Sequence, residues 1–100
     1  MSTLKAKNRR PTHPGAILRE DVLPALGITQ TELADRLRVS RRTVSQVIHE
    51  HRPITPDMAI RLAHLLKTTP ESWLNMQLAL DVWELEREFA HIYEQIKEVA

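Results

Sequence analysis

The sequence predicts an all-α protein built from five helices, and three observations support this fold class. Its 100 residues include only two glycines, and its apolar residues recur three and four positions apart instead of alternating. Serine or threonine stands directly before four of these apolar repeats, as expected of helix N-caps. Hydrophobic residues make up 42% and charged residues 27% of the chain, which is typical of one folded domain.

The first helix is expected over about residues 14–23, with its apolar residues facing the core. Pro24 should break or kink this helix, because a proline ring clashes with the carbonyl four residues back. Gly27 follows, and glycine readily adopts the left-handed conformation that ends such a turn.

The second and third helices are expected over residues 30–37 and 41–49. Thr29 and Glu32 have the spacing of a capping box, in which each side chain binds the other's free backbone amide. Ser40 is the expected N-cap of the third helix. Only a tight turn therefore separates these two helices.

The fourth and fifth helices each begin at a threonine followed by a proline, Thr55-Pro56 and Thr69-Pro70. Threonine is a favourable N-cap, and a proline in the first helical position loses no backbone hydrogen bond. Residues 71–100 contain neither glycine nor proline, so the fifth helix is expected to be long and unbroken. Its apolar residues are spaced alternately by four and three, as in a helix that packs on another helix. The resulting apolar stripe consists of Leu78, Val82, Leu85, Phe89, Ile92, Ile96 and Val99.

This apolar stripe predicts a C-terminal extension, residues 78–100, that serves dimerisation or the binding of a partner. We expect Trp83, which lies beside the stripe, to be a further dimer contact. Packing of the stripe against the protein's own core remains the alternative.

The second and third helices have the spacing of a helix-turn-helix that reads DNA. Ala34 is small where the two helices cross closely, and Val44 and Val47 hold the third helix against the second. Arg41 and Arg42 stand at the start of the third helix, where the helix macrodipole disfavours cations. A binding role therefore explains these arginines better than helix stability does.

The apolar residues of the third helix leave its polar side chains on the outer side and at the N-terminal end. These candidate DNA-binding side chains are Ser40, Arg41, Arg42, Thr43, Ser45, Gln46 and His49. Arginine can bind guanine O6 and N7, glutamine can bind adenine N6 and N7, and serine or threonine suits phosphate contacts. A pair of packed helices with a merely solvated polar face is the alternative interpretation.

The charge of the chain is distributed unevenly. Residues 1–70 carry twelve lysines and arginines against six acidic residues, whereas residues 71–100 carry two against seven. Such asymmetry predicts a basic end that faces a polyanion, although two oppositely biased solvated faces would give the same counts. Residues 1–12 are expected to form a basic arm that contacts phosphates, is ordered by a partner or remains disordered.

Several function classes are excluded or disfavoured by composition. The chain has no cysteine, which excludes disulfides, thiol catalysis and cysteine-bound zinc. No apolar run approaches the ~18 residues of a membrane span, so we expect no membrane association and a cytoplasmic location. His49 and His51, two residues apart, would point in different directions on a helix, and the sequence has no HExxH or His-x3-His pair, so neither a metal nor another cofactor is expected. A partnered nucleophile and a glycine-rich phosphate loop are also lacking, so no enzyme activity is expected.

Residues 28–52 resemble the helix-turn-helix of the Xre/Cro superfamily of phage repressors. Three further motifs, at residues 13–18 (HPGAIL), 52–56 (RPITP) and 69–77 (TPESWLNMQ), resemble HigA/VapI-type antitoxins more narrowly. The resemblance implies a five-helix, lambda-repressor-like domain over residues 13–77 that dimerises and binds operator DNA overlapping its own promoter.

The resemblance further implies that the protein neutralises a HigB-type toxin, an mRNA-cleaving ribonuclease. It also implies that Gln30 contacts a phosphate and that Arg52 lies near the DNA backbone. A stand-alone Xre-type repressor without a toxin remains an alternative, as does a helical adaptor that works through its acidic last helix.

Two positions depart from the family pattern. Arg38 stands where the turn usually has glycine, so it must accept a strained conformation or shift the turn. Glu50 and His51 stand where relatives often have Asn-Gly, so the loop after the third helix is expected to have a different backbone.

Overall fold

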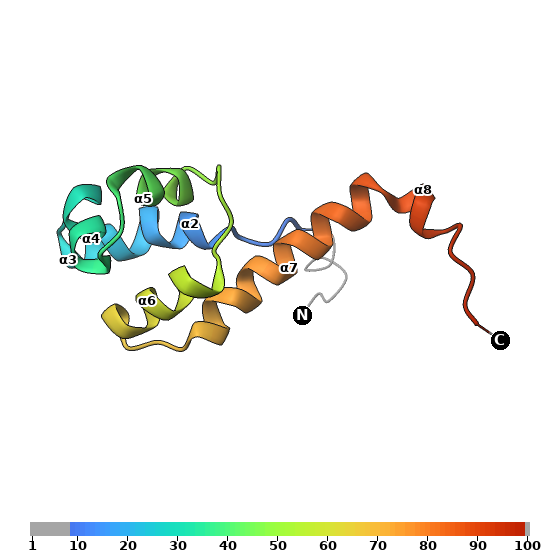
Figure 1. The fold of residues 1–100 in the computed structure, drawn as a ribbon. Coiled ribbons are helices and arrows are strands. Elements are labelled where there is room, and N and C mark those ends of the chain that lie inside the picture. The colour runs from blue at the N-terminus through green and yellow to red at the C-terminus, as the bar shows by residue number, and fades with distance from the viewer. Residues whose placement is uncertain (1–8, 100) are drawn as a thin grey trace, which may run out of the picture.

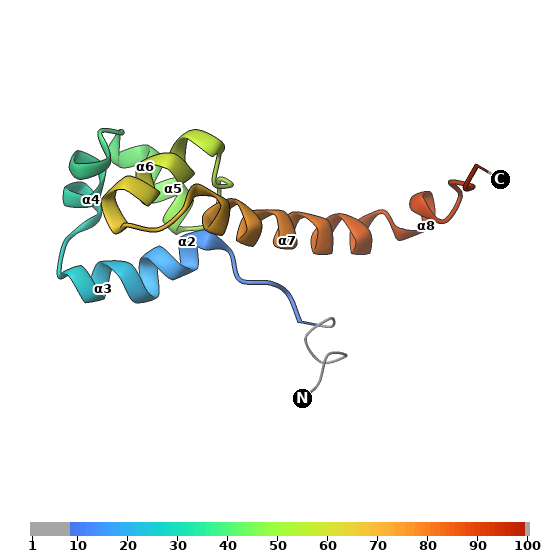
Figure 2. The ribbon, with the colours of Figure 1, turned by 90° about the horizontal axis from the view of Figure 1, so that it is seen from below.

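The computed structural model describes residues 9–99, and among these the regular elements are all helices. The all-α prediction is thereby confirmed. The molecule extends over 52 × 30 × 22 Å, because its longest helix leaves a compact helical body and projects away from it (Figures 1 and 2).

The first helical run is longer than the sequence predicts. It consists of α2 (Pro14–Ile17), the π-helical η1 (Leu18–Val22) and α3 (Leu23–Leu26). The prediction that it stops before Pro24 is wrong, because the run continues to Gly27, which has the expected left-handed φ of 64°. In η1 the amide of Leu23 binds the carbonyl of Leu18, five residues back. This wider turn directly before Pro24 shifts the hydrogen-bond register at the place where a regular helix would meet the proline ring.

The next two helices begin at the predicted caps. They are α4 (Gln30–Leu37) and α5 (Arg41–Ile48). The capping box at the start of α4 is present: the amide of Glu32 donates to Thr29 Oγ1 at 3.1 Å, and the amide of Thr29 donates to Glu32 Oε1 at 3.2 Å. At the start of α5 the amide of Thr43 donates to Ser40 Oγ at 3.1 Å.

The fourth and fifth predicted helices are α6 (Pro56–Leu66) and α7 (Pro70–Glu88). The hydroxyls of Thr55 and Thr69 cap them as predicted. The first part of α7 packs beside α6, and its remaining turns project beyond the body (Figure 1).

One apolar core joins these helices. Its completely buried side chains include Leu33 of α4, Ile48 of α5 and Leu62 of α6. Trp73 at the start of α7 belongs to the same core, and its Nε1 donates to Thr68 Oγ1 at 2.8 Å. Trp73 therefore anchors the start of α7 in the core.

The prediction of one unbroken helix from residue 71 to the C-terminus is wrong. α7 ends at Glu88, and Phe89 has a non-helical backbone (φ −115°, ψ 24°). Up to residue 99, where the described part of the chain ends, the short α8 (Ala90–Tyr93) is the one helix that follows. Ile96 and Val99 are 70% and 97% exposed. A short helix without tertiary contacts is only marginally stable, which explains why helical periodicity alone does not prolong α7.

Candidate nucleic-acid interface

α5 presents one buried and one accessible side. Val44, Val47 and Ile48 are buried against the body, which fixes the orientation of the helix. Arg41 and Arg42 are exposed on its first turn. An eight-residue helix of this kind exposes a rigid, basic and polar surface, with side chains that can form the bidentate contacts used on base edges.

The turn before α5 is held by an arginine from another helix. Arg38 adopts the left-handed conformation with φ 60° and ψ 41°, which confirms that it accepts a strained backbone. Arg61 Nη1 of α6 donates to the carbonyl of Leu37 at 2.9 Å and to that of Arg38 at 3.3 Å. Asp57 holds the same guanidinium through Nε at 2.8 Å. These bonds satisfy carbonyls that the end of α4 would otherwise leave without partners.

The end of α5 is held in the same manner from the first helix. Arg19 Nη1 donates to the carbonyl of Ile48 at 2.7 Å, and its guanidinium lies 3.4 Å from the carboxylate of Glu50. Arg10 approaches the same carboxylate at 3.4 Å. Glu50 itself has a φ of 63°, so the loop here needs the left-handed backbone for which glycine or asparagine is better suited.

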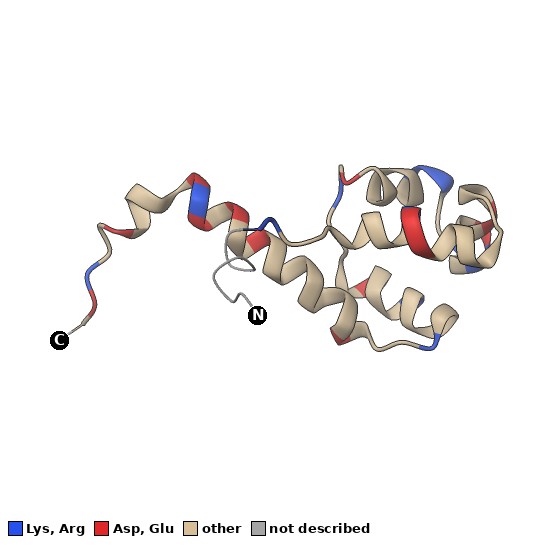
Figure 3. Cartoon of the chain, turned by 180° about the vertical axis from the view of Figure 1, so that it is seen from behind, with Lys and Arg blue, Asp and Glu red and all other residues tan. Residues whose placement is uncertain are grey.

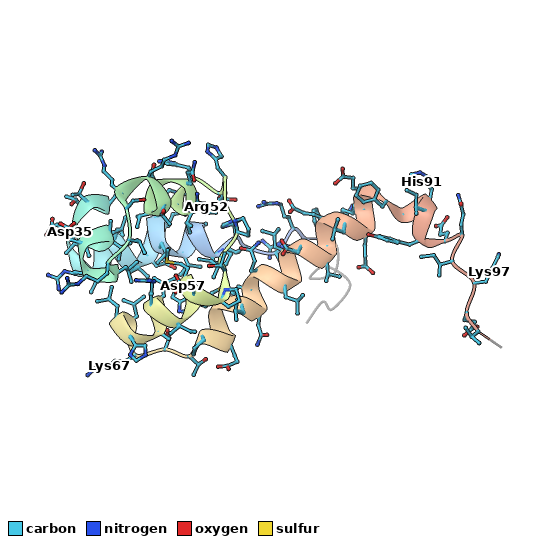
Figure 4. All side chains as sticks on the ribbon, viewed as in Figure 1. Asp35, Arg52, Asp57, Lys67, His91 and Lys97 are labelled. Carbon is cyan, nitrogen blue, oxygen red and sulfur yellow. The ribbon has the colours of Figure 1, made fainter. Side chains whose placement is uncertain are left out.

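The loop after α5 also contacts the beginning of that helix. Arg52 lies on the side of the body that carries α5 (Figure 4). Its Nη1 donates to Thr43 Oγ1 at 3.2 Å, and this hydroxyl oxygen lies 2.9 Å from Ser40 Oγ. Ser40, Thr43 and Arg52 therefore form one connected polar group beside the start of α5.

The fold places the candidate DNA-binding residues on α5, at its two ends and at the start of α4. Exposed members are Ser40, Arg41, Arg42 and His49, and half-buried members are Gln30, Thr43, Ser45, Gln46 and Arg52. Both signs of charge occur on the body, whereas acidic residues outnumber basic ones on the projecting part of α7 (Figure 3).

Sequence reasoning missed four side chains that support this surface. Arg19 and Arg61 bind the ends of α5 and α4, and His13 and Gln77 are buried behind the loop that follows α5. His13 could have been recognised locally, because it precedes Pro14 as a capping residue precedes a first-position proline. The other three act across long sequence separations, which periodicity does not reveal.

The apolar stripe is only partly helical. Its members Leu78, Val82 and Leu85 lie on α7 and are 44–61% exposed. Its later members are distributed over the break after α7, α8 and the tail, namely Phe89, Ile92, Ile96 and Val99. The side chain of Trp83 is half-buried, and its Nε1 has no hydrogen-bond partner among the described residues. The guanidinium of Arg87 lies 4.1 Å from the centre of the Trp83 ring.

Residues 9–99 contain neither a metal-type cluster nor a membrane span. No group of three or more histidine, cysteine or acidic side chains is arranged to hold a metal ion within that range. None of the helices described there is long and apolar enough to cross a membrane. Most of the predicted basic arm, residues 1–8, lies outside the described residues.

α4, the Arg38 turn and α5 define a helix-turn-helix protein. The chain belongs to the helix-turn-helix family, whose model HTH_3 matches residues 18–74. It is 45% identical over 83 residues to the uncharacterized HTH-type transcriptional regulator YbaQ of Escherichia coli K12, covering 83% of this chain and 74% of YbaQ.

The resemblance to HigA antitoxins is also confirmed. Antitoxin HigA-1 of Vibrio cholerae is 41% identical over 81 residues, covering 81% of this chain and 76% of HigA-1. Among solved structures, Pseudomonas aeruginosa antitoxin HigA with the higBA promoter superposes with a TM-score of 0.85 at 35% identity. That alignment covers 91% of this chain and the whole of the other.

Proposed function

We propose that this protein is a sequence-specific DNA-binding antitoxin that represses its own operon. The observation that carries the proposal is the exposed basic and polar side of α5, whose two ends are held by Arg61 and Arg19. A rigid short helix with this surface matches the recognition helix of a helix-turn-helix, which enters the major groove.

In this proposal α5 is the recognition helix. Arg41, Arg42 and Gln46 contact base edges, with arginine on guanine and glutamine on adenine. Gln30, Ser40 and Arg52 contact the phosphate backbone and fix the register of the protein on the duplex. Thr43, Ser45 and His49 complete the surface. The protein acts by binding alone, without catalysis, and it acts in the cytoplasm, where the bacterial operator lies.

Binding to a selected duplex tests the DNA-binding part. We expect the protein to enrich one sequence from a random pool and to bind it more tightly than a scrambled duplex of equal length. The affinity should fall steeply with salt, because each neutralised phosphate releases condensed counterions. Equal affinity for both duplexes, or affinity insensitive to salt, would contradict the proposal.

The antitoxin part is supported by the likeness to HigA-1 and to the HigA–promoter structure. We propose that a HigB-type toxin is encoded beside this gene. Co-expression of the two neighbouring genes with a tag on one product tests this: the toxin should co-purify, and its expression alone should arrest growth.

A second candidate is a stand-alone repressor without a toxin, favoured by the likeness to the regulator YbaQ. A neighbouring gene whose product neither binds this protein nor arrests growth would support that candidate. DNA binding is common to both, so only the toxin experiment separates them.

We propose that the protein binds DNA as a homodimer formed through the apolar stripe and Trp83. Three stripe residues on α7 are exposed, and the half-buried Trp83 lies beside them. Val82→Asp should yield a monomer by light scattering, because it places a charge in an apolar interface. Thr31→Asp on the exposed face of α4 is the control and should remain dimeric. A dimeric V82D variant would remove the stripe from the interface.

A further inference from the structure

Two polar side chains are buried behind the loop that follows α5. Among the described residues, His13 and Gln77 are the buried polar ones, at 5% and 6% exposure. They come from opposite ends of the domain, one before α2 and the other within α7. Burying polar groups is costly unless they are hydrogen-bonded, so the partners of both side chains indicate what they do.

His13 connects the first helix with the loop. Its Nδ1 accepts a hydrogen bond from the amide of Gly15 at 2.8 Å and so caps α2. His13 also lines the same cavity as Arg52, so the imidazole lies beside the loop. The capped Gly15 lies so close to α5 that a Cβ on it would stand 1.9 Å from the carbonyl oxygen of Val47.

Gln77 holds the same loop two residues further along. Its Oε1 accepts from the amide of Ile54 at 2.9 Å, and its Nε2 donates to Asp81 Oδ1 at 2.9 Å. The loop is therefore bound to α7 at Ile54, and near Arg52 it lies beside His13, which caps α2. These contacts lie beside a cavity of about 260 Å3 whose lining includes His13, Glu50, Arg52, Gln77, Asp81 and Glu84.

The attached loop carries Arg52, whose side chain reaches back to Thr43 on the first turn of α5. We propose that His13 and Gln77 are positioning residues for DNA recognition, which hold the loop so that Arg52 fixes the start of the recognition helix. This inference rests on the proposed DNA-binding function. It also gives α7, which carries the dimer stripe, a direct connection to the DNA-binding surface through Gln77.

A proton on His13 should weaken this arrangement. Protonation converts Nδ1 from an acceptor into a donor that faces the amide of Gly15, so the cap is lost. Burial lowers the pKa of His13 below its ordinary value of 6.5; Glu50 and Asp81 oppose this shift and Arg10 adds to it. The cavity is also lined by His51, Arg52 and Glu84.

The sign of the pH dependence follows from this lowered pKa. The unfolded chain binds the proton more readily than the folded protein does, so stability rises with pH over this range. The stabilising contribution of neutral His13 is therefore present above pH 6.5 and is lost as the pH falls from 6.5 through the lower folded pKa.

The test compares affinities for two duplexes, one selected by the wild-type protein from a random pool and one scrambled. Their ratio, the selectivity, cancels general electrostatic effects. Gln77→Met removes the acceptor for Ile54, and its selectivity at pH 7.5 should fall about tenfold, equivalent to ~1.4 kcal/mol. Its affinity for the scrambled duplex should stay within about twofold. Gln95→Met, in the exposed tail, is the matched control and should behave as the wild type.

The dependence of selectivity on pH tests the positioning role of His13. If His13 had a merely structural role, the selectivity of the folded protein would not change with pH. Wild-type selectivity should fall as the pH decreases from 7.5 to 5.5, while far-UV circular dichroism shows the protein still folded. His13→Asn keeps an acceptor for Gly15 but cannot titrate, so its selectivity should be low and independent of pH. His64→Asn, on the exposed side of α6, should retain the wild-type dependence on pH.

Wild-type selectivity in Q77M, or a parallel pH profile in H13N, would overturn the inference and leave DNA binding intact. A wild-type protein with no selectivity at all would instead refute the proposed function. If either variant unfolds, the wild-type profile decides, because a flat profile in the folded protein contradicts the role of His13.

Discussion

Gly15 offers the sharpest test of how the first helix supports α5. The glycine lies at the start of α2, and a Cβ added to it would stand 1.9 Å from the carbonyl oxygen and 2.8 Å from the carbonyl carbon of Val47. Both contacts are to backbone, so no side chain can rotate away. Gly15→Ala therefore requires the two helices to separate by about 1 Å before the methyl group fits at 3.0 Å.

The expected cost follows from the rigidity of this contact. Overpacking a core costs about 1–3 kcal/mol where side chains can adjust, so we expect about 3 kcal/mol here. For a domain of this size, 1 kcal/mol corresponds to about 4–8 °C, and the Tm should fall by more than about 10 °C. Because Val47 belongs to α5, the selectivity for the chosen duplex should fall as well.

Urea denaturation of Gly15→Ala and Gly27→Ala provides the comparison. Gly27 has a φ of 64°, but a methyl group added to it would meet no atom within 4 Å, so its substitution costs only backbone strain, about 1 kcal/mol. G15A should lose clearly more stability than G27A. Equal losses, or a G15A variant as stable as the wild type, would refute the close packing of α2 on α5.

Three further predictions concern the charged groups of the interface. Arg42→Ala should cost about 1–3 kcal/mol in binding and relax the preference at one base pair, and unchanged gel-shift affinities would remove Arg42 from the base-contacting set. Arg61→Met should lower the unfolding free energy by about 1–3 kcal/mol, because the carbonyl of Leu37 loses its hydrogen-bond donor. A stability equal to that of the wild type would contradict the role of Arg61 in holding the turn before α5. Glu50→Gly should change the unfolding free energy by less than about 1 kcal/mol, because glycine relieves the left-handed φ while the ion pairs with Arg19 and Arg10 are lost. A larger loss in urea denaturation would show that the ion pairs stabilise the protein more than the strained φ destabilises it.

The starts of the helices are predictable because each cap is a local interaction. The hydroxyls of the four capping residues each accept from the amide three residues further along the chain, so composition and spacing suffice to find them; they belong to Thr29, Ser40, Thr55 and Thr69. At Arg38 the family resemblance, which has glycine there, leaves either a strained backbone or a shifted turn open, and the structure has the strained, left-handed backbone.

Two helix ends are not predicted correctly because tertiary context decides them. Pro24 is tolerated since a π-helical turn precedes it, and a local rule for proline does not include that turn. The helical periodicity continues past Phe89, but residues beyond it have no core to pack against in the single chain. The spacing of apolar residues predicts which face of a helix would be buried. A short helix is stable only when that face is packed against other parts of the protein.

The support of the recognition helix is not predictable from local patterns. Arg19 binds a carbonyl 29 residues away, Arg61 binds one 24 residues away and Gln77 binds an amide 23 residues away. Two of the motifs that resemble HigA antitoxins contain His13 and Gln77, and a third contains the loop that both hold. The resemblance therefore located residues whose physical role only the folded arrangement explains.

Methylation interference on the selected duplex tests the central claim, that α5 is inserted into the major groove, most directly. Dimethyl sulfate modifies guanine N7 in the major groove and adenine N3 in the minor groove. We expect guanine methylation to block binding at two clusters about ten base pairs apart on one face of the duplex, one for each copy of α5. Interference confined to adenines, or absent from guanines, would show that another surface binds the DNA.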